Sequence, residues 1–297
     1  MRLARIAPLF LLLLAILSAL HLAHVEHFVI KSKVASLGTA LLAALTFRIN
    51  VLEATRGYLP GNWDILWSLS VEEMFYFFFP LTCLLLRRTT LFVFALLVFI
   101  VLGPFGRTVL THGNEVWQEY SYLGSMDAIA LGCLTALVTA RVRLSRVALW
   151  ISGSLGGLCL CFPLLFSRTV AARSVGRLGL DMSVVALGTC LLIAVAAETR
   201  WRCWKILTPL RWLGSRSYEI YLSHMFLVLA LYGAFARWGK PLKGVPILFC
   251  AVIVMAGLLG ELVARFYSEP LNRALRKRLG RSERQLGSAL DLSLIHI

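Results

Sequence analysis

The sequence predicts an all-α protein, a polytopic bundle of eight or nine apolar transmembrane helices. Of its 297 residues, 59% are apolar and 15% are charged, whereas about 25% charged residues is usual in soluble domains. A water-soluble enzyme domain, a nucleic-acid-binding domain and a disordered chain are all disfavoured by this composition. Helices are expected rather than barrel strands, because the apolar runs are long and uniform and backbone in lipid must bond to itself.

Nine apolar stretches approach the roughly 20 residues that cross a bilayer. They are residues 7–24, 34–52, 66–86, 90–106, 121–140, 147–167, 181–197, 217–236 and 245–267. The second stretch is the weakest, because Arg48 and Asn50 lie inside it. We expect it to be re-entrant, which leaves eight true spans. Little chain remains between the spans, so any chemistry must come from helix ends and polar groups within the membrane.

The positions of Lys and Arg predict the orientation of the helices. The net charge of +15 is spread over short gaps between apolar runs, which is typical of cytoplasmic loops facing anionic lipid headgroups and does not call for nucleic acid. We expect Arg87 and Arg88, the 141–146 and 200–216 loops and the tail in the cytoplasm, and residues 62–67 near the outer face. With eight spans both chain ends are cytoplasmic.

The densest group of polar residues opens one apolar run, in WSLSVEEMFYFFFP at residues 67–80. It contains Ser68, Ser70, Glu72, Glu73 and Tyr76. Ionisable groups at membrane depth are costly and indicate function. Successive helical residues are about 100° apart, so the two glutamates cannot both face one pocket, whereas Tyr76 can flank either. The alternative interpretation is a helix start with serine caps and first-turn carboxylates that suit the helix dipole.

Two further groups place polar side chains in apolar runs. In residues 213–226, Ser217, Tyr221 and His224 fall on one helical face with Glu219 opposite. Such a stripe can line a cavity or tie two helices together, and both remain open. In residues 124–134, Asp127 has no basic residue within one turn. Its partner must come from another helix or from substrate.

We expect no metal site and no disulfide framework. Most of the seven cysteines lie in apolar runs without ligand spacing. His21, His24 and His27, spaced three apart, share a helical face and could form a metal box with Glu26, but an interfacial stripe is the preferred interpretation.

The last apolar run carries two features with simple structural interpretations. Glu261 and Arg265 are four residues apart, so we expect them to neutralise each other. Glu269-Pro270 is expected to end the helix.

These motifs together resemble the acyltransferase family 3 membrane proteins, which acylate envelope and exported polysaccharides. Residues 67–80 are similar to that family's Trp-Ser-Leu-Ser-Val-Glu-Glu-Gln-Phe-Tyr signature, with Met74 in place of Gln. Residues 124–134 resemble its Asp-containing helix, with Ser125 where a basic residue is frequent. Residues 213–224 resemble its Leu-Gly-x-x-Ser-Tyr-x-x-Tyr-Leu-x-His segment, and the residues around Glu269 its closing Glu-x-Pro.

The first residues, MRLARIAPLF, resemble the family's Arg-rich entry into a middle helix. Taken alone, the first 24 residues imitate a secretory signal. The resemblance therefore implies a membrane acyltransferase domain at residues 1–278 that lacks the family's opening helices, with their Arg and presumed catalytic His. Residues 279–297 are expected to be a polar tail with a non-native end. On this interpretation the general base is missing, and we expect residues 1–297 alone not to catalyse acyl transfer.

The resemblance implies an O-acyltransferase of the inner membrane that moves an acyl group, most simply acetyl, from acyl-CoA to a hydroxyl of a cell-envelope, exported or lipid-linked saccharide. It implies catalytic roles for Glu72, Glu73 and Tyr76, which would orient the base or bind the acceptor. It implies substrate binding by Trp67, Ser68, Ser70, Asp127, Tyr221 and His224, and CoA phosphate binding by Arg2 and Arg5. The alternatives are a transporter or flippase for small or lipid-linked substrates and an inactive fragment.

Overall fold

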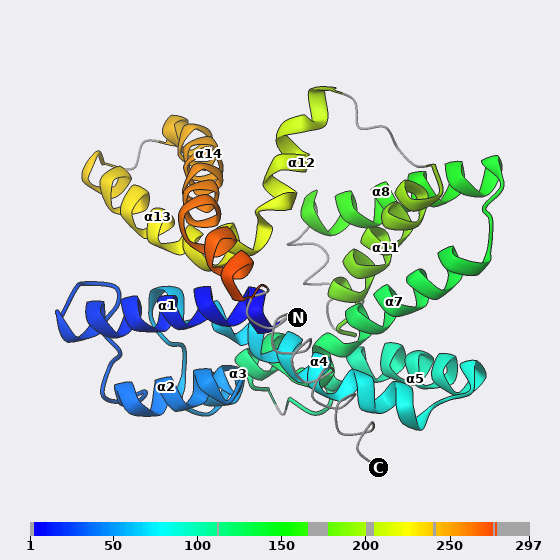
Figure 1. The fold of residues 1–297 in the computed structure, drawn as a ribbon, viewed down its shortest axis with the longest axis horizontal. Coiled ribbons are helices and arrows are strands. Elements are labelled where there is room, and N and C mark those ends of the chain that lie inside the picture. Colours follow the sequence, from blue (N-terminus) through cyan, green and yellow to red (C-terminus); the bar gives the residue numbers. More distant parts are fainter. Residues whose placement is uncertain are drawn as a thin grey trace, which may run out of the picture. The chain divides into compact units, whose positions relative to one another are not determined.

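The computed structural model describes residues 3–111, 113–165, 178–199, 205–239, 242–275 and 277. These residues are predominantly helical and contain no strand, which confirms the predicted all-α class (Figure 1). Within them, seven helices are long and apolar enough to cross a membrane, and Ile6–Leu22 is a shorter apolar helix. Together they make eight, the lower of the two predicted helix numbers.

The long helices follow the predicted stretches closely. They are α1 (Leu3–Leu22), α4 (Leu66–Leu85), α5 (Thr89–Thr108), α7 (Tyr122–Arg141), α8 (Arg146–Leu165), α11 (Asp181–Thr199), α13 (Ser217–Arg237) and α14 (Val245–Val263). Shorter elements connect them: α2 (Leu37–Leu45), α3 (Ile49–Arg56), η1 (Gly61–Trp63), α6 (Glu115–Tyr120), η2 (Lys205–Leu207), α12 (Thr208–Ser215), η3 (Leu242–Gly244) and the π-helical turn η4 (Ala264–Ser268).

The stretch 34–52 is not one helix. It is broken between α2 and α3, where Phe47 adopts a φ of 55° and its carbonyl accepts a 2.6 Å hydrogen bond from the Tyr122 hydroxyl. In α3, Asn50 is fully buried and donates to the carbonyl of Tyr120 at 3.0 Å. Neither α2 nor α3 is long enough to cross a bilayer. This confirms that the stretch forms no single span, and its re-entrant course stays a prediction.

The chain divides into two compact units. The first comprises residues 1–30, 60–65 and 204–297, and contains α1, α12, α13 and α14. The loop before α4 enters this unit, where Trp63 is fully buried and Asn62 donates to the carbonyl of Leu222 in α13 at 2.8 Å. The second unit comprises residues 31–59 and 66–203. In it, α5 packs on α7, and α11 packs on both α7 and α8 (Figure 1).

The prediction that Glu269-Pro270 ends the last helix is wrong. Helical residues continue through Pro270 to Leu275. A proline lacks its N–H and its ring clashes with the carbonyl four residues earlier in a regular helix. Here the turn just before it is widened to a π turn, in which the N–H of Glu269 donates to the carbonyl of Ala264. Such a turn relieves the crowding, so the helix passes the proline without ending.

Candidate functional site

A cavity of about 860 Å³, lined by both apolar and polar side chains, lies within the second unit, between α4, α5, α6, α7 and α11. We call it the polar cavity to distinguish it from an apolar one in the same unit. Its polar lining includes three carboxylates and one amide, from Glu115, Gln118, Glu119 and Asp181. In the part of the chain that the structure describes, none of the three carboxylates forms an ion pair. Carboxylate and amide oxygens are good acceptors for hydroxyl groups. The cavity is therefore suited to a hydroxyl-rich ligand.

Two stacked aromatic rings form one side of this cavity. The rings of Trp67 and Tyr120 are nearly parallel, with centroids 4.2 Å apart. Tyr120 lies on the short helix α6, which Asn114 fixes at its start. The Asn114 side chain caps the helix by accepting the N–H of Trp117, and it donates to the carbonyl of Ala54 at 2.7 Å. Trp67, predicted to bind substrate, thus contributes a flat apolar surface held in place by packing.

A buried ion pair lies in the cavity wall. Arg107 of α5 donates to Asp127 of α7 from both terminal guanidinium nitrogens, Nη2 at 2.7 Å and Nη1 at 3.0 Å. The remaining N–H groups of Arg107 donate to Ser183 of α11 and to the carbonyls of Gly124 and Gly179. Arg107 is 5% exposed and Asp127 is fully buried. The predicted interhelical partner of Asp127 is therefore Arg107, and all five donors of the guanidinium are used.

The acceptor positions of the Asp127 carboxylate are all used, as are the donors of Arg107. One oxygen accepts from Arg107 and from the N–H of Ala128, and the other accepts from Arg107 and from the Ser183 hydroxyl. A carboxylate has about four acceptor positions. Asp127 consequently has no free acceptor position for a substrate proton in this arrangement. Its hydrogen bonds instead connect the helices that form the cavity wall.

Two glycines allow this network to form. A Cβ at Gly103 of α5 would lie 2.5 Å from the Cβ of Asp127, so only glycine permits this approach of α5 to α7. Gly179 has a φ of 63°, in the left-handed region that favours glycine, and turns its carbonyl toward Arg107. The backbone at both positions therefore depends on the absence of a side chain.

The predicted acid pair lies on α4, outside the lining of the polar cavity. Glu72 is exposed and Glu73 and Tyr76 are half-buried, which agrees with the expectation that the two acids face different directions. Ser68 is half-buried, while Ser70 is buried and donates its hydroxyl to the carbonyl of Leu66 at 3.0 Å. The catalytic and binding roles of this helix stay predictions.

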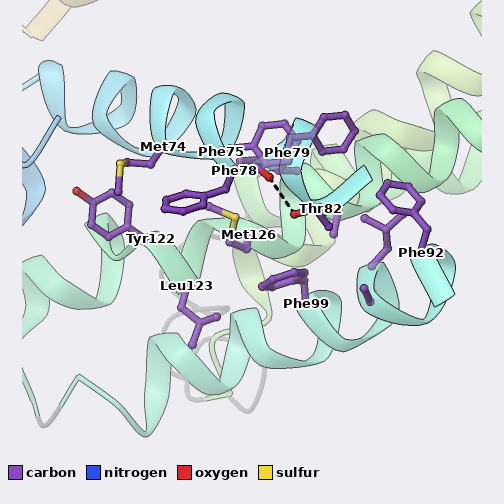
Figure 2. A pocket seen from close by; sticks show the side chains of 14 residues that line it. Met74, Phe75, Phe78, Phe79, Thr82, Phe92, Phe99, Tyr122, Leu123 and Met126 are labelled. Carbon is purple, nitrogen blue, oxygen red and sulfur yellow. Dashed lines mark hydrogen bonds between the residues drawn. The ribbon is translucent and has the colours of Figure 1, made fainter. Parts of the chain in front are cut away.

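A second cavity in the same unit is apolar. It has a volume of about 410 Å³ and lies between α4, α5 and α7. Figure 2 shows that phenylalanine rings and two methionines surround it, including Phe75, Phe78, Phe99, Met74 and Met126. The two cavities use different faces of α7.

Tyr221 and His224 belong to the first unit, and their role in substrate binding stays a prediction. The Tyr221 hydroxyl donates to the carbonyl of Ile65 at 2.6 Å. The His224 ring places Nδ1 2.7 Å from the carbonyl of Tyr221. A carbonyl only accepts, so Nδ1 carries the hydrogen and Nε2 of a neutral ring is the acceptor. On the predicted polar face, Tyr221 and His224 are half-buried and Ser217 is exposed. Glu219, predicted on the opposite face, is 6% exposed.

The predicted pairing of Glu261 with Arg265 is wrong. Glu261 binds Arg216 at 2.7 Å and the indole N–H of Trp212 at 3.1 Å. Arg216 also binds Glu269 at 2.6 Å, and Arg265 is exposed. The hydrogen bonds that Arg216 donates to Glu261 and Glu269 raise the pKa of its guanidinium above the ordinary value. Spacing within a helix did not decide this pairing, because the competing partner comes from the start of α13.

The two predicted CoA-binding arginines and the three spaced histidines lie near the start of the chain. Arg2 lies outside the described residues, and the side chain of Arg5, in the first turn of α1, is also outside them. The histidines share no helical face, since α1 ends at Leu22 and His24 and His27 have positive φ. The His21 ring nitrogen instead accepts the N–H of Ile30 at 3.0 Å. Among the described residues no group of three potential metal ligands comes together.

Sequence reasoning missed Arg107 and Ser183 of the ion-pair network. It also missed the cavity carboxylates of Glu115, Glu119 and Asp181. For Arg107 the sequence did carry a signal: Arg107 ends one apolar run, and Asp127 lies one turn into the next. Because consecutive spans run in opposite directions, these two positions fall at similar depth in the membrane.

Comparison with known proteins identifies relatives. The profile of a family described as an acyltransferase domain matches residues 1–261. The O-acetyltransferase OatA of Staphylococcus aureus (strain NCTC 8325 / PS 47) is 25% identical over 222 residues, which cover 70% of this chain and 36% of that protein. The peptidoglycan O-acetyltransferase OatA of Listeria monocytogenes is 30% identical over 188 residues, which cover 56% of this chain and 29% of the relative. No solved structure matches.

Proposed function

Because the chain belongs to the acyltransferase domain family, we propose that the protein is an inner-membrane O-acyltransferase that acetylates a cell-wall saccharide. The aligned part spans about a third of each curated relative it matches. The acceptor class follows from the relatives, one of which is named for peptidoglycan. The observation that carries the proposal is the polar cavity, which combines an aromatic surface with carboxylates that form no ion pair among the described residues. It lies within a bundle of apolar helices.

The acceptor saccharide is proposed to occupy this polar cavity. Its hydroxyls would donate to the carboxylates of Glu115, Glu119 and Asp181, and the C–H face of a sugar ring would pack on Trp67. The buried pair of Arg107 and Asp127 would keep the wall in place while the ligand binds. A fixed, partly apolar cavity with a few polar groups is the usual form of a small-ligand site.

The proposed donor is acetyl-CoA on the cytoplasmic side. In the reaction the saccharide oxygen bonds to the acyl carbon, the thioester C–S bond breaks, and CoA leaves as the thiol with the proton of the hydroxyl. This step needs a base for the hydroxyl and hydrogen-bond donors for the oxyanion. We propose that Glu72, Glu73 and Tyr76 orient the base or the acceptor, that Ser68, Ser70, Tyr221 and His224 contribute to substrate binding, and that Arg2 and Arg5 bind the CoA phosphates.

Analysis of cell-wall acetate tests the proposal. The gene is deleted in its own organism and restored on a plasmid, and base-labile acetate is measured in the purified wall saccharide. The expected result is loss of the ester on deletion and its return on complementation. Unchanged acetate in the deletion strain, or a change in saccharide export without a change in acetate per sugar, would contradict it and favour a transporter.

A further inference from the structure

Among the described residues that line it, the apolar cavity between α4, α5 and α7 has no free side-chain O–H or N–H donor. The hydroxyls among these described lining residues are those of Thr82 and Tyr122. The Thr82 hydroxyl donates to the carbonyl of Phe78 at 3.0 Å, drawn as a dashed line in Figure 2. The Tyr122 hydroxyl donates to the carbonyl of Phe47 at 2.6 Å. With both protons used, the cavity suits hydrocarbon, and its methionines and phenylalanines can adapt to a flexible chain.

The shape and position of the cavity suit a chain that enters from the bilayer. Its lining on α7 extends from Tyr122 to Ala130, which is about 12 Å along the helix axis. Phe78 and Phe99 line it while remaining 48% and 37% exposed on candidate membrane-spanning helices. The cavity is therefore continuous with the membrane-facing surface.

Hydrocarbon alone cannot give this cavity a preferred occupant. Lipid tails are as apolar as the lining, so transfer from bilayer to cavity has little hydrophobic driving force. Selection of one lipid must come from its headgroup. Tyr122, Leu123 and Met126 of α7 line the apolar cavity, whereas Gly124 and Ser125 line the polar one. One helix, about 10 Å across, separates the two cavities at this level.

We propose that the apolar cavity binds the hydrocarbon chain of a lipid whose saccharide headgroup is the acyl acceptor in the polar cavity. The inference rests on the proposed function, because it takes the ligand of the polar cavity to be a saccharide. It adds that the acceptor is a lipid-linked glycan. Its hydrocarbon chain would lie in the apolar cavity and its saccharide in the polar cavity, on opposite sides of the start of α7.

Photo-crosslinking tests this placement without requiring turnover. The probe is a polyisoprenyl diphosphate-linked disaccharide with a diazirine near the middle of the chain, added to membranes that contain the full chain. Labelled peptides are identified by mass spectrometry. We expect labelling of the cavity segments of α4, α5 and α7, and competition by an excess of the same lipid without the diazirine. A diacyl phospholipid probe or a long-chain acyl-CoA probe that labels these segments equally would overturn the proposal.

A matched pair of variants on α5 tests the cavity itself. Ala95 lines it, whereas Leu97 does not and is 48% exposed. Ala95→Trp fills the cavity and is expected to reduce labelling roughly tenfold, equivalent to about 1.4 kcal/mol, and Leu97→Trp to leave it unchanged. Met126→Trp on α7 is the second filling variant should Ala95→Trp not insert. Equal labelling in a filled variant and in Leu97→Trp would overturn the inference.

Acetyl transfer measured on the same membranes separates the two proposals. Labelling that needs the saccharide headgroup, together with wall acetylation, supports both. Wall acetylation without selective labelling contradicts the lipid-chain inference alone. Selective labelling in a protein whose deletion leaves wall acetate unchanged contradicts the proposed function and, with it, the role of the lipid as acceptor.

Discussion

The two units each contain an arginine that binds carboxylates, but in different surroundings. Arg107 in the second unit is 5% exposed and joins α5, α7 and the start of α11 through five hydrogen bonds. Arg216 in the first unit has a side chain 24% exposed and links the start of α13 to Glu261 and Glu269. A buried charge left without its partner is costly, whereas an exposed one is solvated. The same residue types should therefore be indispensable in one unit and adjustable in the other.

The largest contrast we expect is in accessibility to reagents outside the cell. The end of α5 is predicted to lie at the outer face of the membrane, and the start of α13 in the cytoplasm. Arg107 ends α5, and Arg216 precedes α13, in the loop predicted to be cytoplasmic. In a variant lacking its seven native cysteines, Arg56→Cys should react with an impermeant maleimide from outside intact cells, and Arg88→Cys only after lysis. Reaction of Arg88→Cys but not of Arg56→Cys in intact cells would contradict the predicted orientation and indicate the opposite one.

Removal of Arg107 should have the largest effect on stability. Arg107→Met leaves Asp127 buried without its cation, which typically costs about 3–5 kcal/mol. We expect a large fall in the thermal unfolding temperature of the detergent-purified protein. The double variant Arg107→Met/Asp127→Leu should recover part of the loss, since no buried charge remains. A single variant that unfolds like the wild type would show that the network does not hold these helices.

A side chain at Gly103 should disturb the same network by steric means. Its Cβ would lie 2.5 Å from that of Asp127, so Gly103→Val forces α5 and α7 apart, and overpacking of this kind costs about 1–3 kcal/mol. Gly153→Val on α8 is the control, because its Cβ meets nothing within 4 Å. Equal unfolding temperatures for the two variants would contradict the close approach of α5 and α7.

Loss of Glu261 should have the smallest effect. Its side chain is 30% exposed, and Arg216 keeps Glu269 as a second partner. Glu261→Gln is expected to lower the unfolding temperature less than either preceding variant, with a difference that shrinks as salt is raised. A loss as large as that of Arg107→Met would show that exposure does not distinguish the two networks.

Composition and hydrophobic runs predicted the helical class and the positions of the long helices, because the bilayer fixes how long an apolar helix must be. The break in 34–52 was also predictable, since Arg48 and Asn50 interrupt that stretch. The ion-pair partners of Asp127 and Glu261 could not be predicted from the sequence. Asp127 was expected to find a partner on another helix, but Arg107 could not be named, and Glu261 was assigned to Arg265 because spacing along one helix is visible in a sequence. Packing between helices decided both pairings.

The passage of the last helix through Pro270 was missed for a similar reason. A proline in a sequence does not by itself show where a helix ends, since Pro80, Pro104 and Pro163 lie inside α4, α5 and α8. The widened turn at residues 264–268 before Pro270 becomes apparent only in the structure. The site predicted at Glu72, Glu73 and Tyr76 remains a proposal. Of the predicted binding residues, the polar cavity includes Trp67 and Asp127.

The central claim is that the polar cavity of the second unit binds the acceptor saccharide, and acceptor kinetics test it most directly. Acetyl transfer to a soluble peptidoglycan fragment is measured in membranes of the deletion strain after the gene has been restored with Trp67→Leu or with Trp150→Leu, a residue of α8 that is 78% exposed. Loss of the stacked ring should raise KM for the fragment roughly tenfold, or about 1.4 kcal/mol, and leave KM for acetyl-CoA unchanged, while Trp150→Leu changes neither. An unchanged KM for the fragment in Trp67→Leu, or an equal rise in both KM values, would contradict the account.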